Sequence, residues 1–335
     1  MHMADALVSP AVAGSMYTLS TVAAGVSVRK VRLENEPSKI PVMGVMGAFV
    51  FAAQMINFAI PGTGSSGHLC GGMLLSALLG PYGGFLTMIG ILLIQCLLFA
   101  DGGLLALGCN VWNMAFYGCF IGALVIWRMI MKKGMSRGKI VGASIFGCIF
   151  TLQLGAFSVC IETLASGITA LPFTTFLALM QPIHLAIGLV EGFITAAVLV
   201  FVYETRPEML YCYNAESKAT DKGFTLNKVL TIMAVITAVV AGGLSLLASS
   251  DPDGLEWSIL NVTGSEELEA AGQIYENSSA IQETTSLLPD YAFPNSDSIL
   301  GTTFSGIVGC LVVVALCFAV SYGFRFFKSK KVTKA

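Results

Sequence analysis

Long apolar stretches separated by short polar connections make up most of the chain. Nearly all of them approach or exceed the roughly 20 residues that a helix needs to cross a hydrocarbon core of about 30 Å. The pattern therefore predicts an all-α, polytopic membrane protein. Eight such stretches lie at residues 6–28, 41–60, 82–100, 103–127, 140–163, 173–204, 227–248 and 301–324.

A ninth apolar segment, residues 68–79, is about half as long as a membrane span and has glycine-rich turns on both sides. Such a short helix is tolerated at membrane depth only where protein or a cavity satisfies its free backbone groups. We expect His68 to begin this helix and Ser65 and Ser66 to cap its start. The segment therefore indicates a binding site.

The positive charges predict how the bundle is oriented. All 18 Lys and Arg residues lie in four segments, 29–39, 128–139, 206–228 and 325–334. If these segments are cytoplasmic, nine crossings place the amino terminus outside and the carboxyl terminus in the cytoplasm, provided that the short ninth segment counts. The loop 249–300 then lies outside, and it holds ten acidic residues and no Lys or Arg.

Composition supports the membrane class and narrows the function. Hydrophobic residues make up 55% of the 335 positions and charged residues 11%, outside the range of soluble domains. Residues 134–139 resemble a phosphate loop, but they lack its spacing and its Ser or Thr, so the chain is not expected to bind ATP. The nine cysteines include no C-x-x-C pair. We expect neither an enzyme nor a protein with a prosthetic group.

The first two residues carry a compact set of nitrogen donors. The α-amine of Met1, the amide nitrogen of His2 and the His2 imidazole close a five-membered and a six-membered chelate ring. Planar nitrogen sets suit Ni²⁺, Co²⁺ and Cu²⁺, and His68, on the same outer side, would supply the fourth nitrogen. The alternatives are a histidine in a frayed terminus for His2 and a helix-capping or interface histidine for His68.

Other polar residues in or beside the spans are candidates for supporting roles, because polar groups in a membrane are costly. Asn57 and Gln95 are expected near the outer ends of their helices, either supporting the histidines or joining helices. Asp101 lies at an external turn, where it would orient a histidine or cap the next helix. His184 and Glu191 share one helix face, as a second metal station, a proton relay or a structural polar network.

Several short motifs lie within residues 1–204. They are Met1-His2-Met3-Ala4-Asp5, the glycine-rich run 62–72, the segments 99–104 and 107–114, and His184-Leu185 with Glu191-Gly192. Together they resemble the CbiM/NikM family, the substrate-binding S components of energy-coupling-factor (ECF) transporters for cobalt and nickel. Here Asp5 replaces the family's Glu in a shifted position, so the resemblance assigns it no role.

The carboxyl-terminal part carries the signature Pro252-Asp253-Gly254-Leu255-Glu256. It resembles the two-helix N component of these transporters, fused to the M component. The resemblance divides the chain into a metal-binding membrane domain, residues 1–210 with seven crossings, and a PDGLE-like domain, residues 225–335 with two crossings. This form of the N component slightly favours nickel, but the residues do not separate Ni²⁺ from Co²⁺.

The resemblance also implies a site, partners and a location. The metal, which is the transported substrate, would be held by Met1, His2 and His68. The partners would be a CbiQ/NikQ-like transmembrane coupling protein, a CbiO/NikO-like ATPase pair and the lipid of the plasma membrane, with no nucleic acid. The alternative is a self-sufficient metal-ion channel or carrier. We further expect the terminus to close over the metal, and the loop 249–300 either to gate the site or to act as a spacer.

Overall fold

Helices make up most of the computed structural model, which describes residues 1–31, 38–214, 223–266, 268–296 and 298–332. In this part of the chain, six helices are long and apolar enough to cross a membrane, and two apolar helices are shorter. The all-α membrane class is confirmed. The six are α1 (Pro10–Lys30), α3 (Gly72–Leu98), Leu107–Met131, α6 (Arg137–Ser166), α7 (Phe173–Thr205) and α11 (Leu300–Val332), and the shorter two are α2 (Lys39–Gln54) and α8 (Leu226–Gly242).

Many large apolar side chains on these helices are exposed. Phe193 on α7 and Leu311 on α11 are 56% and 64% exposed, and Phe146 on α6 is 56% exposed. Exposed apolar surface of this extent is typical of a protein that contacts lipid. Nine crossings and the orientation of the termini stay predictions, and four of the cationic positions behind them, Arg32, Lys218, Lys222 and Lys334, lie outside the described residues.

The helix from Leu107 to Met131 is continuous but changes its winding. It consists of α4 (Leu107–Asn110), a π-type segment η2 (Val111–Trp127) and α5 (Arg128–Met131). It packs closely on α3, because a Cβ on Gly118 would lie 3.0 Å from the Cα of Gly72. Two glycines thus allow the two backbones to touch.

Helix α3 contains two predicted segments, the short one and the span after it. Its winding breaks at Gly80, whose φ of 76° and ψ of 169° are not helical, and Pro81 follows. A Cβ on Gly84 would lie 2.9 Å from the Cα of Ser76, so the second half folds back along the first. The helix begins at Gly72, and the prediction that His68 begins it is wrong.

The glycine-rich run before His68 forms a β-hairpin instead of a helix start. Strands β1 (Phe58–Ile60) and β2 (Ser65–Gly67) pair antiparallel across a turn in which Gly62 and Gly64 have positive φ. The predicted helix-capping role of Ser65 and Ser66 is therefore wrong. Their hydroxyls instead donate to main-chain carbonyl groups, and that of Ser66 reaches the carbonyl of Asp251 at 2.7 Å.

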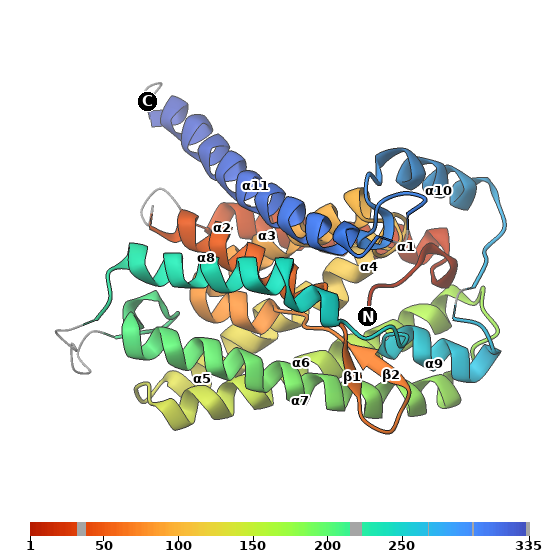
Figure 1. Ribbon diagram of the computed structural model, residues 1–335, viewed down its shortest axis with the longest axis horizontal. Helices are drawn as coiled ribbons and strands as arrows, with labels where there is room; N and C mark the ends of the chain where they lie inside the picture. The colour runs from red at the N-terminus through yellow and green to blue at the C-terminus, as the bar shows by residue number, and fades with distance from the viewer. Residues whose placement is uncertain (32–37, 215–222, 267, 297, 333–335) are drawn as a thin grey trace.

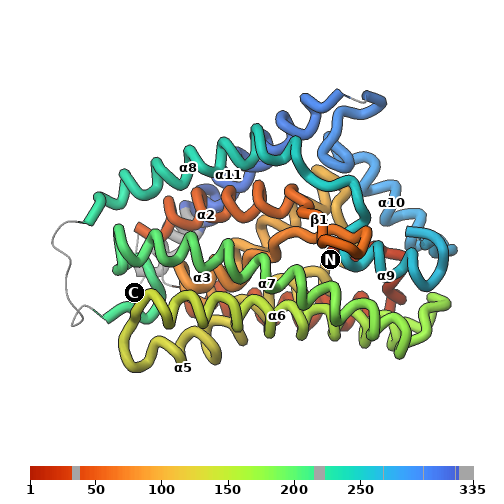
Figure 2. The backbone as a smooth tube through the Cα atoms, turned by 60° about the horizontal axis from the view of Figure 1, so that its bottom comes forward, coloured from red at the N-terminus to blue at the C-terminus, as the bar shows by residue number. Residues whose placement is uncertain are grey.

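The acidic loop between α8 and α11 is largely ordered. Together with the hairpin it lies at one end of the bundle, whereas α5 and the start of α8 lie at the other end (Figures 1 and 2). Tyr275 and Ser278 of this loop hydrogen-bond to Val8 and Asp5, so it covers the amino-terminal segment. Its elements are η4 (Leu244–Leu247), α9 (Gly254–Thr263), α10 (Gln273–Thr285) and η5 (Pro289–Tyr291), and the remaining short turns of the chain are η1 (Asp5–Leu7) and η3 (Pro207–Met209).

Candidate metal-binding site

Met1 and Met3 are buried in the bundle, and His2 between them is half-buried. The exposed fractions of Met1 and Met3 are 4% and 0%. The amide of Met3 donates to Oδ1 of Asn110 at 2.7 Å, and its carbonyl accepts from Nδ2 of Asn110 at 3.1 Å and from the amide of Gly103 at 2.9 Å. Hydrogen bonds on both sides of the Met3 backbone, together with two buried side chains, hold the terminus in one place.

The α-nitrogen of Met1 lies 3.0 Å from Nε2 of His68. The Nδ1–H of His68 donates to the carbonyl of Leu69 at 2.9 Å, which leaves the lone pair of Nε2 directed at Met1. Metal–imidazole bonds are about 2.0–2.1 Å long, and two such ligands at a right angle are about 3 Å apart. The separation of the two nitrogens is thus that of neighbouring ligands of one ion.

His2 lies beside His68, with their rings stacked at a centroid distance of 5.2 Å. Its Nδ1 is 3.0 Å from a carboxylate oxygen of Asp101, and its Nε2 donates to Oε1 of Gln95 at 3.3 Å. The hydroxyl of Tyr291 donates to the other Asp101 oxygen at 2.5 Å. The structure therefore brings Gln95 and Asp101 to His2. Asp101 does not cap a helix.

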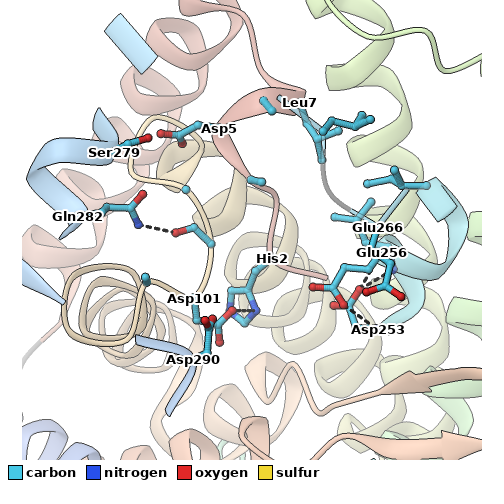
Figure 3. Close-up of a pocket in the computed structure, with 18 of the residues that line it drawn as sticks. His2, Asp5, Leu7, Asp101, Asp253, Glu256, Glu266, Ser279, Gln282 and Asp290 are labelled. Carbon is cyan, nitrogen blue, oxygen red and sulfur yellow. Dashed lines mark hydrogen bonds and ion pairs between the residues drawn. The ribbon is translucent and has the colours of Figure 1, made fainter. Parts of the chain in front are cut away.

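Asn57 lies beyond the end of α2 and contacts neither histidine through a hydrogen bond in the described residues. Its carbonyl accepts from the amide of Ser249 at 2.7 Å. With His2 and His68 it lines a cavity of about 670 Å³, in which Asp253 and Glu256 lie apart from His2 and Asp101 (Figure 3). The acidic side chains of this cavity are Asp5, Asp101, Asp253, Glu256, Glu266, Glu269 and Asp290.

Charges around the Met1 amine are strongly coupled. Burial lowers the pKa of this amine, but the Asp253 carboxylate, which forms an ion pair with it, raises the pKa above its usual value of 8.0. Burial and the neighbouring amine lower the pKa of His68, so its imidazole is neutral at neutral pH. Although burial opposes it, the amine holds the pKa of Asp253 well below its usual range. Burial, with the charge of Asp253, raises the pKa of Glu256 to about 7.

His184 and Glu191 are both buried beneath the site, but the structure gives them separate partners. Glu191 accepts hydrogen bonds from the amides of Cys70 and Gly71 at 3.0 and 2.9 Å, so it holds the backbone that follows His68. The Nδ1–H of His184 donates to the carbonyl of Met180 at 2.8 Å. Its Nε2 has no hydrogen-bond partner in the described residues.

The sequence assigns no role to three contributors to the site, although two of them, Asn110 and Asp253, lie in the motifs that carry the family resemblance. Asn110 binds the Met3 backbone, Tyr291 binds Asp101, and Asp253 binds the Met1 amine. Asp5 accepts from the amide of Ala106 and from the hydroxyl of Ser278, which gives it a structural role. Among the described residues, no three His, Cys, Asp or Glu side chains are grouped so that they could hold a metal ion.

The fold and these residues define a polytopic helical membrane protein with a buried cluster of nitrogen donors and carboxylates at one end. A family of cobalt uptake substrate-specific transmembrane regions, CbiM, matches residues 2–209, and the PDGLE domain matches residues 227–326. The chain belongs to the CbiM family and carries a fused PDGLE domain, which confirms the predicted membership. Relatives in this family are named as metal transport proteins, and the chain is not an enzyme.

Some relatives match nearly the whole chain, and others match only part of it. The chain is 37% identical over 321 residues to the "Putative fused nickel transport protein NikMN" of Archaeoglobus fulgidus, covering 96% of this chain and 98% of that one. It is 29% identical to the cobalt transport protein CbiM of Sorangium cellulosum over 57% of this chain and 85% of that one. A crystal structure of a truncated transition metal transporter is similar with a TM-score of 0.54 and 30% identity, over 61% of this chain and 99% of that one.

Proposed function

We propose that this chain is the substrate-binding component of an ECF-type importer and that it takes up Ni²⁺ or Co²⁺ from outside. The observation that carries the proposal is the 3.0 Å distance between the Met1 nitrogen and Nε2 of His68, with the His2 ring stacked alongside. These groups come from two distant parts of the chain. They converge at one cavity.

The four ligands would be the amine of Met1, the amide nitrogen and Nδ1 of His2, and Nε2 of His68. A planar set of nitrogens favours Ni²⁺ or Cu²⁺ over metals that prefer oxygen. In the structure Nδ1 of His2 faces Asp101 instead of His68. Metal loading therefore includes a turn of the His2 ring, which breaks the contact of Nδ1 with Asp101.

The arrangement of the ends supports uptake from outside. The site, the hairpin and the acidic loop share one end of the bundle, and α5, from a cationic segment, lies at the opposite end (Figure 1). By the positive-inside rule the site end is outside the plasma membrane, with nine crossings between the two termini. A CbiQ/NikQ-like coupling protein and a CbiO/NikO-like ATPase pair would supply the energy.

The decisive experiment removes the Met1 amine. Adding Gly-Ser ahead of Met1 converts the amine into an amide and fills its buried pocket, so Ni²⁺ binding measured by calorimetry should be lost. The same two residues added after Ala335 are the matched control and should leave binding unchanged. Undiminished Ni²⁺ binding by the amino-terminally extended protein contradicts the proposal. Metal uptake by this chain without ATPase partners would instead support a self-sufficient carrier.

A further inference from the structure

One carboxylate of the PDGLE domain reaches the proposed metal ligands. Asp253 is separated from Met1 by 252 positions, yet its Oδ2 contacts the Met1 amine and lies 3.8 Å from Nε2 of His68. The side chain is 11% exposed. The same oxygen thus faces both nitrogens that are neighbours in the proposed coordination plane.

The other oxygen of Asp253 fixes the orientation of the carboxylate. Oδ1 accepts hydrogen bonds from the amides of Leu255 and Glu256 at 2.7 and 3.0 Å, and the Glu256 side chain accepts from the amide of Asp253. This is a capping box at the start of α9. Because Oδ1 caps the helix, Oδ2 is the oxygen that faces the proposed metal ligands.

The backbone around Asp253 is attached to the metal-binding domain itself. The amide of Ser66 donates to the carbonyl of Pro252 at 2.8 Å, next to a parallel bridge between Ser66 and Asp253. A Cβ on Gly254 would lie 2.9 Å from Cδ1 of Ile187 and 3.1 Å from Cε1 of His184. A side chain at position 254 would force these side chains to shift, so the segment that carries Asp253 packs closely on α7.

We propose that Asp253 is a further metal ligand, an oxygen donor that the PDGLE domain supplies to the nitrogen site of the CbiM domain. The inference rests on the proposed function. Ni²⁺ bound to one deprotonated amide leaves one positive charge in a buried place, and a buried charge is costly unless it is paired. Asp253 neutralises that charge. The ion is then shared by both domains and fastens them together.

The test replaces Asp253 by Asn in the full-length chain. Asn is as good a helix cap as Asp, so α9 keeps its start while the anionic oxygen is lost. The matched control is Asp251→Asn, with the same change of charge two positions away; its carboxylate accepts from Ser249 and not from the site. Nickel K-edge X-ray absorption reports the ligands, and calorimetry over a pH series gives the affinity at its alkaline plateau.

We expect the wild-type protein and Asp251→Asn to show nitrogen ligands with one additional oxygen. Asp253→Asn should show planar nitrogen coordination alone and a plateau affinity for Ni²⁺ at least about tenfold lower, since even the loss of an outer-shell partner costs a metal site about this much. Asp253→Ser, which also retains a cap, should behave in the same way. If either capped variant has the wild-type spectrum and plateau affinity, Asp253 is not a ligand.

The two levels of the proposal fail in different ways. If Asp253→Asn binds Ni²⁺ as the wild type does while His68→Ala does not bind, the nitrogen site stands and the inference is overturned. If the wild-type chain binds neither Ni²⁺ nor Co²⁺, or binds Ni²⁺ equally well without His68, the proposed function itself is overturned.

Discussion

Nε2 of His68 lies 3.0 Å from the α-nitrogen of Met1, although 67 positions separate the two residues. The contact results from two independent constraints. Asn110 holds the backbone of Met3 on one side, and the β-hairpin followed by α3 places His68 on the other. Since Asn110 and residues 65–72 are buried, these constraints position the two nitrogens before any metal binds.

Replacing His68 by Ala should abolish tight Ni²⁺ binding, because it removes one nitrogen of the proposed coordination plane. We expect a loss of more than about 100-fold in affinity, beyond the usual cost of changing a supporting residue. His184→Asn is the control, since an Asn amide can still donate to the Met180 carbonyl that His184 binds. Calorimetry on both variants decides; equal losses would show that the effect is one of folding, not of ligation.

Glu191 should be needed for the geometry of the His68 loop although it does not reach the proposed ligand plane. Its two oxygens accept from the amides of Cys70 and Gly71, and Gln offers only one acceptor. Glu191→Gln should weaken Ni²⁺ binding about tenfold and lower the melting temperature in detergent. Glu204→Gln on the same helix removes an exposed ion pair with Arg137 and should change neither quantity. Wild-type affinity in Glu191→Gln would contradict this role.

The sequence predicts the helices well because hydropathy and span length are local properties. Seven of the eight long apolar stretches correspond each to one apolar helix or continuous helical segment, and the eighth, residues 82–100, is the second half of α3. The helix expected from His68 onward starts four residues later because the preceding glycines form a turn with positive φ that favours a hairpin. Local apolar character does not distinguish these outcomes.

The candidate site is also predicted only in part from the sequence. Histidine is a rare residue in this chain. His2 stands at the terminus and His68 follows a glycine-rich run, so the sequence pattern indicates both. Asp253 belongs to a loop with ten acidic residues, and nothing local shows that this carboxylate, 252 positions from Met1, is the one that turns inward. Contacts between residues so far apart in the sequence depend on how the two domains pack.

Acidification should weaken Ni²⁺ binding through Met1 more than through His68. Burial lowers the pKa of the Met1 amine, but the Asp253 carboxylate outweighs this effect and raises the pKa above 8.0. A proton therefore competes with the metal for the amine throughout the neutral range. The pKa of His68 is lowered, and its imidazole is already neutral there. Affinity should fall at least about tenfold per pH unit below the amine pKa. Calorimetry in buffers with different ionisation enthalpies counts the released protons; a flat profile from pH 6 to 8 would rule out the amine as a ligand.

The packing of Met1 against α6 should be sensitive to a single methyl group. A Cβ on Gly155 would lie 2.5 Å from the carbonyl oxygen of Asn113 and 3.1 Å from Cε of Met1. Since a backbone carbonyl cannot move aside cheaply, Gly155→Ala should destabilise the protein by about 1–3 kcal/mol and displace Met1, with a measurable loss of Ni²⁺ affinity. Gly142→Ala on the same helix meets nothing within 4 Å and should leave melting temperature and affinity unchanged or slightly raise the former. Identical melting curves and Ni²⁺ titrations for the two variants would show that the α6 contact does not position Met1.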